Sequence, residues 1–237
     1  MRMARCVQPE WLDHLDPEDP RASRSRRDLQ RVNKVMGNAA ILARALRKAQ
    51  PPHSPPWPRL IVELGAGDGT LLLQMLQRST LQWQGGTILF VDRQNLVGTG
   101  TRAAFNALGW DVDTVEADAV TWLQHAPPGP IDLMIANLFL HHFHAQQLTM
   151  LLASAATRAN LFVACEPRRS YRALAGSALL GALGCNDVSR HDAVVSVRAG
   201  FADHELSAFW PALPRYRLEE YAAGLFSHCF VAQRTHA

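Results

Sequence analysis

The amino-acid sequence predicts an α/β fold in which parallel strands alternate with helices around one sheet. Three observations indicate this class. Short apolar runs alternate along the chain with helix-like segments. One apolar run ends in a glycine-rich turn at residues 65–69, where such folds pass from strand to helix. Finally, the chain has 237 residues, 48% of them hydrophobic and 19% charged, so it can bury one core without metals or disulfides.

Five strands are predicted in the first part of the chain. The apolar runs that predict them lie at 60–64, 87–91, 112–115, 131–136 and 161–165. Between them, apolar residues at helical spacing predict helices over 71–77, 96–108 and 146–158. Strands that alternate with helices form a parallel sheet through right-handed crossovers.

The C-terminal part breaks this alternation. Residues 216–221 and 227–232 are predicted strands, and the short connection 222–226 makes them an antiparallel hairpin. Helices are expected over 171–183 and 204–210, whereas 192–200 is ambiguous between strand and helix.

The N-terminal segment carries the positive charge of the chain. Residues 20–48 hold nine basic residues and one acid, although the whole chain has a net charge of only +3. Leu29, Val32 and Met36 form the apolar face of a predicted helix, with basic residues opposite, and Gly37 ends it. Asn38 is expected to cap a second helix. The basic face is interpreted as a solvated surface, a lid or a patch for an acidic partner.

A proline-rich linker at 51–58 predicts a division into two parts. Residues 1–50 are expected to form a helical N-terminal cap, and residues 51–237 the main α/β domain.

Composition excludes several classes of protein. The sequence contains no apolar run that could span a membrane and no apolar core of a signal peptide. The four cysteines are widely spaced and form no C-x-x-C pair, which favours a reduced, cytoplasmic protein over a disulfide scaffold.

The segment ELGAGDG, residues 63–69, is the strongest functional signal. Glycines at 65, 67 and 69 let the backbone turn sharply after a strand and approach a ligand closely. The turn would lie at the carboxyl edge of the sheet, where α/β folds bind ligands. Its spacing differs from the G-x-G-x-x-G of dinucleotide-binding enzymes, although a glycine turn alone also fits another nucleotide.

The chain from about 60 to 234 resembles the class I S-adenosylmethionine-dependent methyltransferases, which have a Rossmann-like sheet of seven strands, mostly parallel, with an antiparallel C-terminal strand. The resemblance implies that the cofactor S-adenosylmethionine binds, with S-adenosylhomocysteine as the product. The residues that match the family's cofactor motifs are Glu63, Gly65, Ala66, Gly67, Asp92, Arg93, Asp118, Ala119, Asn137 and Leu138.

Each matched acid has a role that the resemblance implies and a plainer alternative. Asp92 would accept hydrogen bonds from the ribose hydroxyls, since a carboxylate suits a vicinal diol. Taken alone, Asp92 is also an ordinary turn residue at a strand end. Asp118 would meet the adenine amino group beside the Ala119 N–H, but it could instead cap a helix.

The segment NLFLHHFH, residues 137–144, points to the acceptor. It lacks the Asn/Asp-Pro-Pro-aromatic motif used on amide and adenine nitrogens, and it resembles the His-His segment of small-molecule methyltransferases. A neutral imidazole suits deprotonation of a phenol, so His142, or else His141 or His191, is the candidate base. Alternatively, His141 or His142 caps a helix or shapes the pocket. Zinc binding by His141, His142 and His144 is not expected, because consecutive histidines point in different directions.

The prediction is therefore an enzyme that methylates the oxygen of a small aromatic or phenolic molecule, as in secondary metabolism. The alternatives are C-methylation of a quinol-like ring, RNA methylation, an NAD(P)-dependent oxidoreductase and a non-catalytic binding protein. A nucleic-acid partner is disfavoured because the basic helices lack interleaved aromatic residues. A homodimer is left open.

Arg168 and Arg169 are expected in a solvated loop or on an acidic substrate group. His191 is not expected to pair with the adjacent Asp192.

Overall fold

The computed structural model describes residues 3–16, 18–49, 58–78, 83, 85–126 and 129–235. The strands are β1 (Leu60–Leu64), β2 (Gly86–Asp92), β3 (Trp110–Glu116), β4 (Ile131–Asn137), β5 (Ala159–Pro167), β6 (Tyr216–Ala223) and β7 (Ser227–Arg234). The α-helices are α1 (Pro20–Met36), α2 (Asn38–Ala49), α3 (Thr70–Arg78), α4 (Thr99–Ala107), α5 (Ala119–His125), α6 (Ala145–Arg158), α7 (Tyr171–Ala178), α8 (Asp187–Ala199) and α9 (Glu205–Phe209). Three short 3-10 helices are η1 (Leu12–His14), η2 (Leu140–His142) and η3 (Leu179–Gly181).

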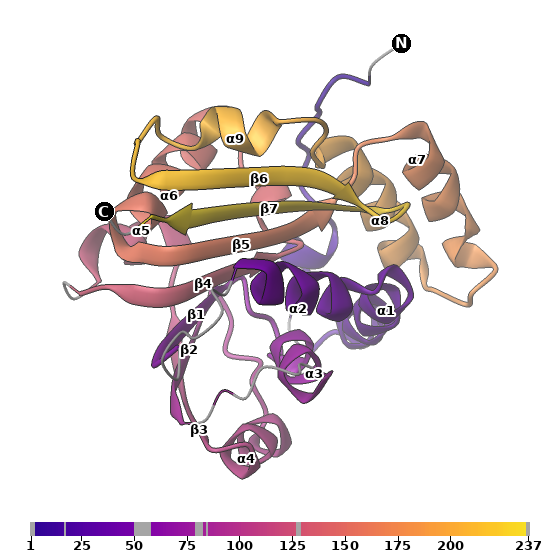
Figure 1. Ribbon diagram of the computed structural model, residues 1–237. Coiled ribbons are helices and arrows are strands. Elements are labelled where there is room, and N and C mark those ends of the chain that lie inside the picture. Colours follow the sequence, from indigo (N-terminus) through magenta and orange to yellow (C-terminus); the bar gives the residue numbers. More distant parts are fainter. Residues whose placement is uncertain are drawn as a thin grey trace.

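All seven strands form one sheet, in the order β3-β2-β1-β4-β5-β7-β6 (Figure 1). The pairs among β1 to β5 are parallel, whereas β7 pairs antiparallel with both β5 and β6. The predicted fold class and the C-terminal hairpin are thus confirmed. The strand order reverses between β1 and β4, which is where open α/β sheets bind ligands.

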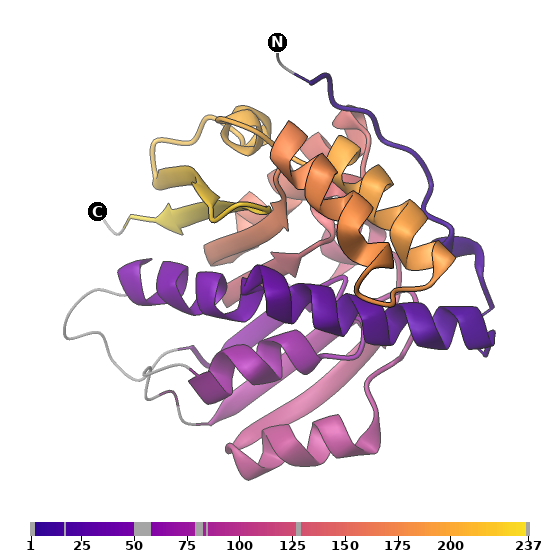
Figure 2. The same cartoon turned by 90° about the vertical axis from the view of Figure 1, so that its right-hand side faces the viewer.

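Helices cover both faces of the sheet and bury its apolar side chains. Residues of α5, α6 and α9 pack on one face, and residues of α2, α3 and α4 pack on the other. Figure 2 shows α1 continuing into α2 across one side of the molecule, with α7 and α8 beside α1. The carboxyl ends of the parallel strands therefore face α1, α7 and α8.

The structure corrects the predicted packing of α1. Leu29 is 37% exposed, whereas Ala22, Ser25 and Asp28 are buried. Ser25 and Asp28 bind Ser189 and the Asn186 N–H at the start of α8, so this helix packs through small and polar side chains. The basic residues of the predicted opposite face are exposed as predicted; they are Arg24, Arg27, Arg31 and Lys34. Arg26, also in α1, is only partly exposed.

Two further expectations at the N-terminus have different outcomes. Asn38 does not cap α2 by its side chain: its amide donates to Asn33 Oδ1 and its Oδ1 accepts from Ser227, inside the protein. Residues 51–57 of the predicted linker lie outside the described residues, so the division at residue 50 stays a prediction.

Other boundaries shift by a few residues, and the ambiguous stretch 192–200 is resolved as the second half of α8. Among the described residues, no helix is both long and apolar enough to cross a bilayer.

Candidate active site

The glycine-rich turn after β1 forms the floor of the candidate site. Gly65, Gly67 and Gly69 have φ angles of 66°, 55° and 72°, a region that side chains with a Cβ rarely adopt. A Cβ on Gly65 would lie 2.1 Å from the ring of Phe139, whereas one on Gly67 would meet nothing within 4 Å. The turn is therefore closed by protein at Gly65 and open at Gly67, so a ligand can approach the backbone there.

Asp92 links this turn to the end of β2 by hydrogen bonds. One carboxylate oxygen accepts the Gly67 N–H at 2.9 Å, and the other accepts the Gln94 N–H at 3.0 Å. Asp92 is thus the turn residue of the plainer interpretation. Because each carboxylate oxygen has a second lone pair, the side chain can still accept from a ligand.

Two buried acceptor atoms in this region are left without a partner among the described residues. They are Glu63 Oε2, on β1, and Asn137 Oδ1, at the end of the neighbouring strand β4. Burial raises the pKa of Glu63 well above its usual range, and the negative charges of Asp68 and Asp92 add to this. A buried, unsatisfied acceptor is costly, so the pair marks a place for a donor or a cation.

The backbone just after Asn137 is strained. Leu138 has a φ of 49°, and its N–H donates to the Cys165 carbonyl at 2.9 Å. A residue other than glycine in this region costs free energy and often belongs to a functional site. Here it turns the chain from β4 into the His-His segment.

Asp118 adopts the alternative role that the sequence left open. It caps α5 by accepting the Thr121 N–H at 3.0 Å, and its other oxygen pairs with Arg93 at 2.9 Å. Ala119 is the first residue of α5, where backbone N–H groups have no acceptor within the helix.

Helix α1 covers this site through side chains that the sequence did not single out. Arg26 donates to Gln94 at 3.2 Å, Gln30 donates to Asp68, and Asn33 accepts from Asn137 at 3.2 Å. Positions 26, 30 and 33 share one helical face. Their partners lie just after β2, just after β1 and at the last residue of β4. The i, i+4, i+7 spacing was visible in the sequence, but the partners were not.

His141 is enclosed by two carboxylates. Its Nδ1 lies 2.8 Å from Glu166 Oε2, and its Nε2 lies 3.3 Å from Glu10 Oε1. Burial alone would lower its pKa, but the hydrogen bonds and charges of the two glutamates raise the pKa of His141 to about 9. Glu166 also accepts the N–H groups of Phe139 and Leu140, so it holds the whole turn after β4.

His142 and His191 both contact the N-terminal segment. His142 is partly exposed, and its Nδ1 lies 3.4 Å from Asp13 Oδ2. The His191 ring stacks on Trp11 with centroids 3.8 Å apart. Contrary to the expectation, His191 Nδ1 pairs with the adjacent Asp192 at 2.9 Å. The same carboxylate oxygen accepts the Trp11 N–H, so Asp192 joins His191 to the N-terminal segment.

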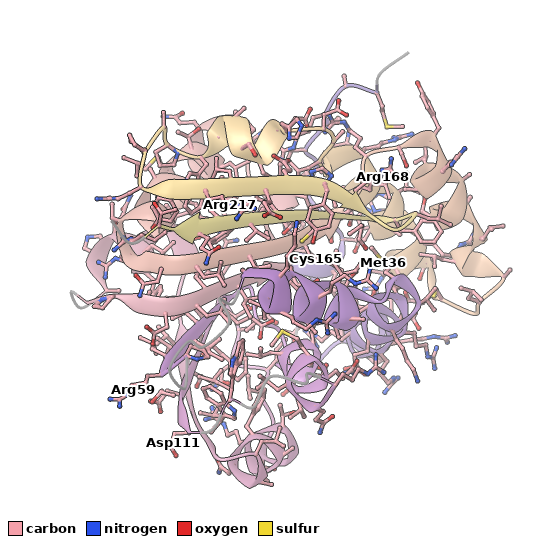
Figure 3. The ribbon with its side chains drawn as sticks, in the orientation of Figure 1. Met36, Arg59, Asp111, Cys165, Arg168 and Arg217 are labelled. Atoms are coloured by element: carbon pink, nitrogen blue, oxygen red, sulfur yellow. The ribbon has the colours of Figure 1, made fainter. Side chains whose placement is uncertain are left out.

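The structure also places the two arginines that follow β5. Arg169 is buried, where it pairs with Glu205 and donates to the Gly200 carbonyl, so the expected solvated loop is wrong for this residue. Arg168, labelled in Figure 3 at the carboxyl end of β5, donates to the Gly224 carbonyl at 3.3 Å.

One group of side chains near the histidines has the composition of a cation site. Glu10, His141 and His142 offer ligand atoms that lie within 4.8 Å of one another. His144 does not belong to this group; it is exposed and precedes α6.

Comparison with known proteins identifies the fold. The chain is similar to an O-methyltransferase family protein from Burkholderia thailandensis, with a TM-score of 0.59 and 18% identity over 93% of this chain and 61% of that one. It is similar to magnesium protoporphyrin IX methyltransferase (ChlM) from Synechocystis PCC 6803 with bound SAH, with a TM-score of 0.56 and 13% identity over 92% and 96%. A third is an O-methyltransferase family 2 protein from Planctomyces limnophilus DSM 3776 in complex with apigenin, with a TM-score of 0.57 and 14% identity over 91% and 64%.

These likenesses establish the class I methyltransferase fold for this chain. The chain spans about three fifths of the length of the Burkholderia and Planctomyces proteins. No protein-family model and no curated protein matches the sequence.

Proposed function

We propose that this chain transfers a methyl group from S-adenosylmethionine to a small aromatic acceptor, on a phenolic oxygen. The observation that carries this proposal is a pair of buried acceptors, Glu63 Oε2 and Asn137 Oδ1, for which the described part of the chain offers no partner. They belong to the region of a glycine turn that is open at Gly67. The α-ammonium group of the cofactor is a cationic donor that would satisfy such acceptors. When bound, the cofactor supplies an electrophilic methyl group on a sulfonium.

Residues after β2 and β3 would hold the adenosine part. Asp92 would accept from the ribose hydroxyls with its remaining lone pairs, beside Arg93. Asp118 and the N–H of Ala119, at the start of α5, would meet the adenine ring. Gly65, Ala66 and Leu138 would line the cofactor, and α1 would cover it through Gln30 and Asn33.

His142 is the base that the geometry favours. His141 is unsuited to this role, because it is buried and its raised pKa keeps it protonated at neutral pH. His142 follows the strained turn after β4 and is partly exposed toward the N-terminal segment. His191 remains the second candidate. A neutral imidazole would take the phenolic proton as the oxygen attacks.

Similar solved structures agree with this choice of cofactor and acceptor. ChlM was solved with bound SAH, and the Planctomyces protein was solved in complex with apigenin. C-methylation of a quinol-like ring, RNA methylation and an NAD(P)-dependent reaction remain the alternatives to test. A cytoplasmic location, a homodimer and a separate cap over residues 1–50 stay predictions of the sequence.

Isothermal titration calorimetry tests the cofactor. We expect micromolar binding of S-adenosylmethionine and S-adenosylhomocysteine and no binding of NADH or NADPH. Binding of NADH alone would instead support the oxidoreductase. Acceptors are then screened as phenols by mass spectrometry, where a gain of one methyl group identifies the product; a gain on carbon would support the quinol alternative.

A further inference from the structure

The N-terminal strap, residues 10–13, lies against the histidines of the candidate site. Its first residue, Glu10, is buried and accepts hydrogen bonds from Ser196 and His141. Burial alone would raise the pKa of Glu10, but the hydrogen bond and charge of His141 lower it to about 2. Glu10 is therefore ionised at neutral pH and anchors the strap to the turn after β4.

Two backbone hydrogen bonds continue the anchoring. The carboxylate of Asp192, which is 6% exposed, accepts the Trp11 N–H at 2.8 Å and the Leu12 N–H at 3.0 Å. The Trp11 ring stacks on His191 with an interplanar angle of 9°. These contacts fix both the position and the direction of the strap where η1 begins.

The strap places Asp13 beside His142. With Glu10 to Leu12 held on both sides, the Asp13 carboxylate lies 3.4 Å from His142 Nδ1. A carboxylate at Nδ1 favours the tautomer that carries its proton there, and this leaves Nε2 as the acceptor. Asp13 is half exposed, so it can be replaced without opening the core.

We propose that Asp13 is a positioning residue: it orients His142 and selects the tautomer in which Nε2 takes the acceptor's proton. The inference rests on the proposed function, because it assigns His142 as the base. In the balanced reaction the acceptor oxygen bonds to the methyl carbon, the sulfur keeps the electrons of the broken carbon–sulfur bond, and the phenolic proton passes to Nε2. The product is a methyl ether with His142 as imidazolium.

The direct test is nuclear magnetic resonance of protein labelled with ¹⁵N-histidine. His142 is assigned by its loss in His142→Gln, and the ring nitrogens then report its tautomer. We expect the Nδ1–H form in the wild type and a change to the Nε2–H form in Asp13→Ala. Asp16→Asn, an exposed acid three residues further along, serves as the matched control and should leave the spectrum unchanged. An unchanged tautomer in Asp13→Ala would overturn the proposal.

A kinetic test separates positioning from a merely structural role. With phenol as the acceptor, Asp13→Ala should lower kcat by about tenfold to a hundredfold, because general-base catalysis by His142 is partly lost. With the more acidic 4-nitrophenol the loss should be much smaller, because less basic assistance is needed. Asp13→Asn, which keeps an acceptor oxygen, should recover part of the rate. An equal loss with both phenols would contradict the proposal.

Two results keep this inference distinct from the proposed function. If the wild type binds no S-adenosylmethionine or methylates no phenol, the proposed function fails, and the tautomer measurement alone decides the role of Asp13. Metal analysis tests the remaining interpretation, in which Glu10, His141 and His142 bind a cation. A stoichiometric divalent cation that is lost in His141→Ala would assign Glu10, His141 and His142 to a metal and overturn the proposal.

Discussion

At the scale of single residues, the site combines groups that are poorly satisfied by the protein alone. Glu63 has a buried oxygen without a partner among the described residues and a raised pKa, and Leu138 has a left-handed backbone. Each of these features costs stability in the free protein. They lie at the ends of β1 and β4, where the strand order reverses. Such an arrangement is expected of a site that a ligand completes.

Glu63→Gln tests this at the residue scale. The folded pKa of Glu63 is raised, so above its unfolded value the native state keeps a proton that the unfolded state has lost, and stability falls as pH rises toward the folded pKa. We expect the neutral glutamine to raise the Tm of the free protein at pH 7–8, where 1 kcal/mol corresponds to about 2–4 °C. Cofactor affinity should fall. Calorimetry and thermal denaturation at several pH values measure both effects, and a variant that is less stable yet binds normally would refute the assignment.

At the scale of elements, two glycines of one turn should respond differently. Both Gly65 and Gly67 have positive φ, so alanine costs about 1 kcal/mol at either position. Only at Gly65 would the added Cβ also clash with the Phe139 ring.

We expect Gly65→Ala to lower both stability and cofactor binding, whereas Gly67→Ala should chiefly weaken binding. Urea denaturation and calorimetry on the two variants give the comparison. Equal effects on stability and on affinity in the two proteins would mean that the ligand does not approach at Gly67.

Helix α1 is the second element with a specific role in the proposed site. Gln30 reaches the glycine turn through Asp68, and Lys34 lies exposed on the same helix. Losing one hydrogen bond lowers the free energy that holds the helix in place by about 1 kcal/mol. We therefore expect Gln30→Ala to speed S-adenosylhomocysteine dissociation about fivefold in stopped-flow measurements. Lys34→Ala is the control, and a similar acceleration in both variants would indicate that α1 does not cover the cofactor.

At the scale of the whole molecule, one buried cluster joins three distant parts of the chain. Glu10 comes from the N-terminal strap, His141 follows β4, and Glu166 lies near the end of β5. Arg5 adds hydrogen bonds to the carbonyls of His141 and Phe143. The charge of His141 therefore contributes to docking of the strap and to global stability together.

The charge of His141 makes the free energy of unfolding depend on pH with a definite sign. The folded pKa of His141 is about 9, above its ordinary value of 6.5, so its contribution is fully present below pH 6.5 and is lost as pH rises to 9. The loss should be on the order of 3 kcal/mol in the free energy of unfolding. Urea denaturation between pH 6 and 9.5 measures it. His141→Gln should be less stable at pH 6.5 and show a flatter profile; an identical slope would show that another group titrates.

The sequence could predict what depends on neighbouring residues. The alternating strands and helices, the glycine turn and the acid at the end of β2 follow from local patterns, and the structure has them where expected. The buried face of α1 was mispredicted, because its packing against α8 uses Ser25 and Asp28 rather than the larger apolar residues.

Other parts of the candidate site could not be read from the chain. Glu10 and Asp13 precede their histidine partners by more than 125 residues, and Asn33 precedes Asn137 by 104. No local pattern encodes such pairs, since they arise only when strands, helices and strap pack together. The sequence by itself therefore determined the fold class and the residues at the strand ends. Tertiary structure alone decided that His141 is an enclosed cation, that α1 covers the glycine turn and that Asp13 faces His142, because burial and long-range contacts set charge and orientation.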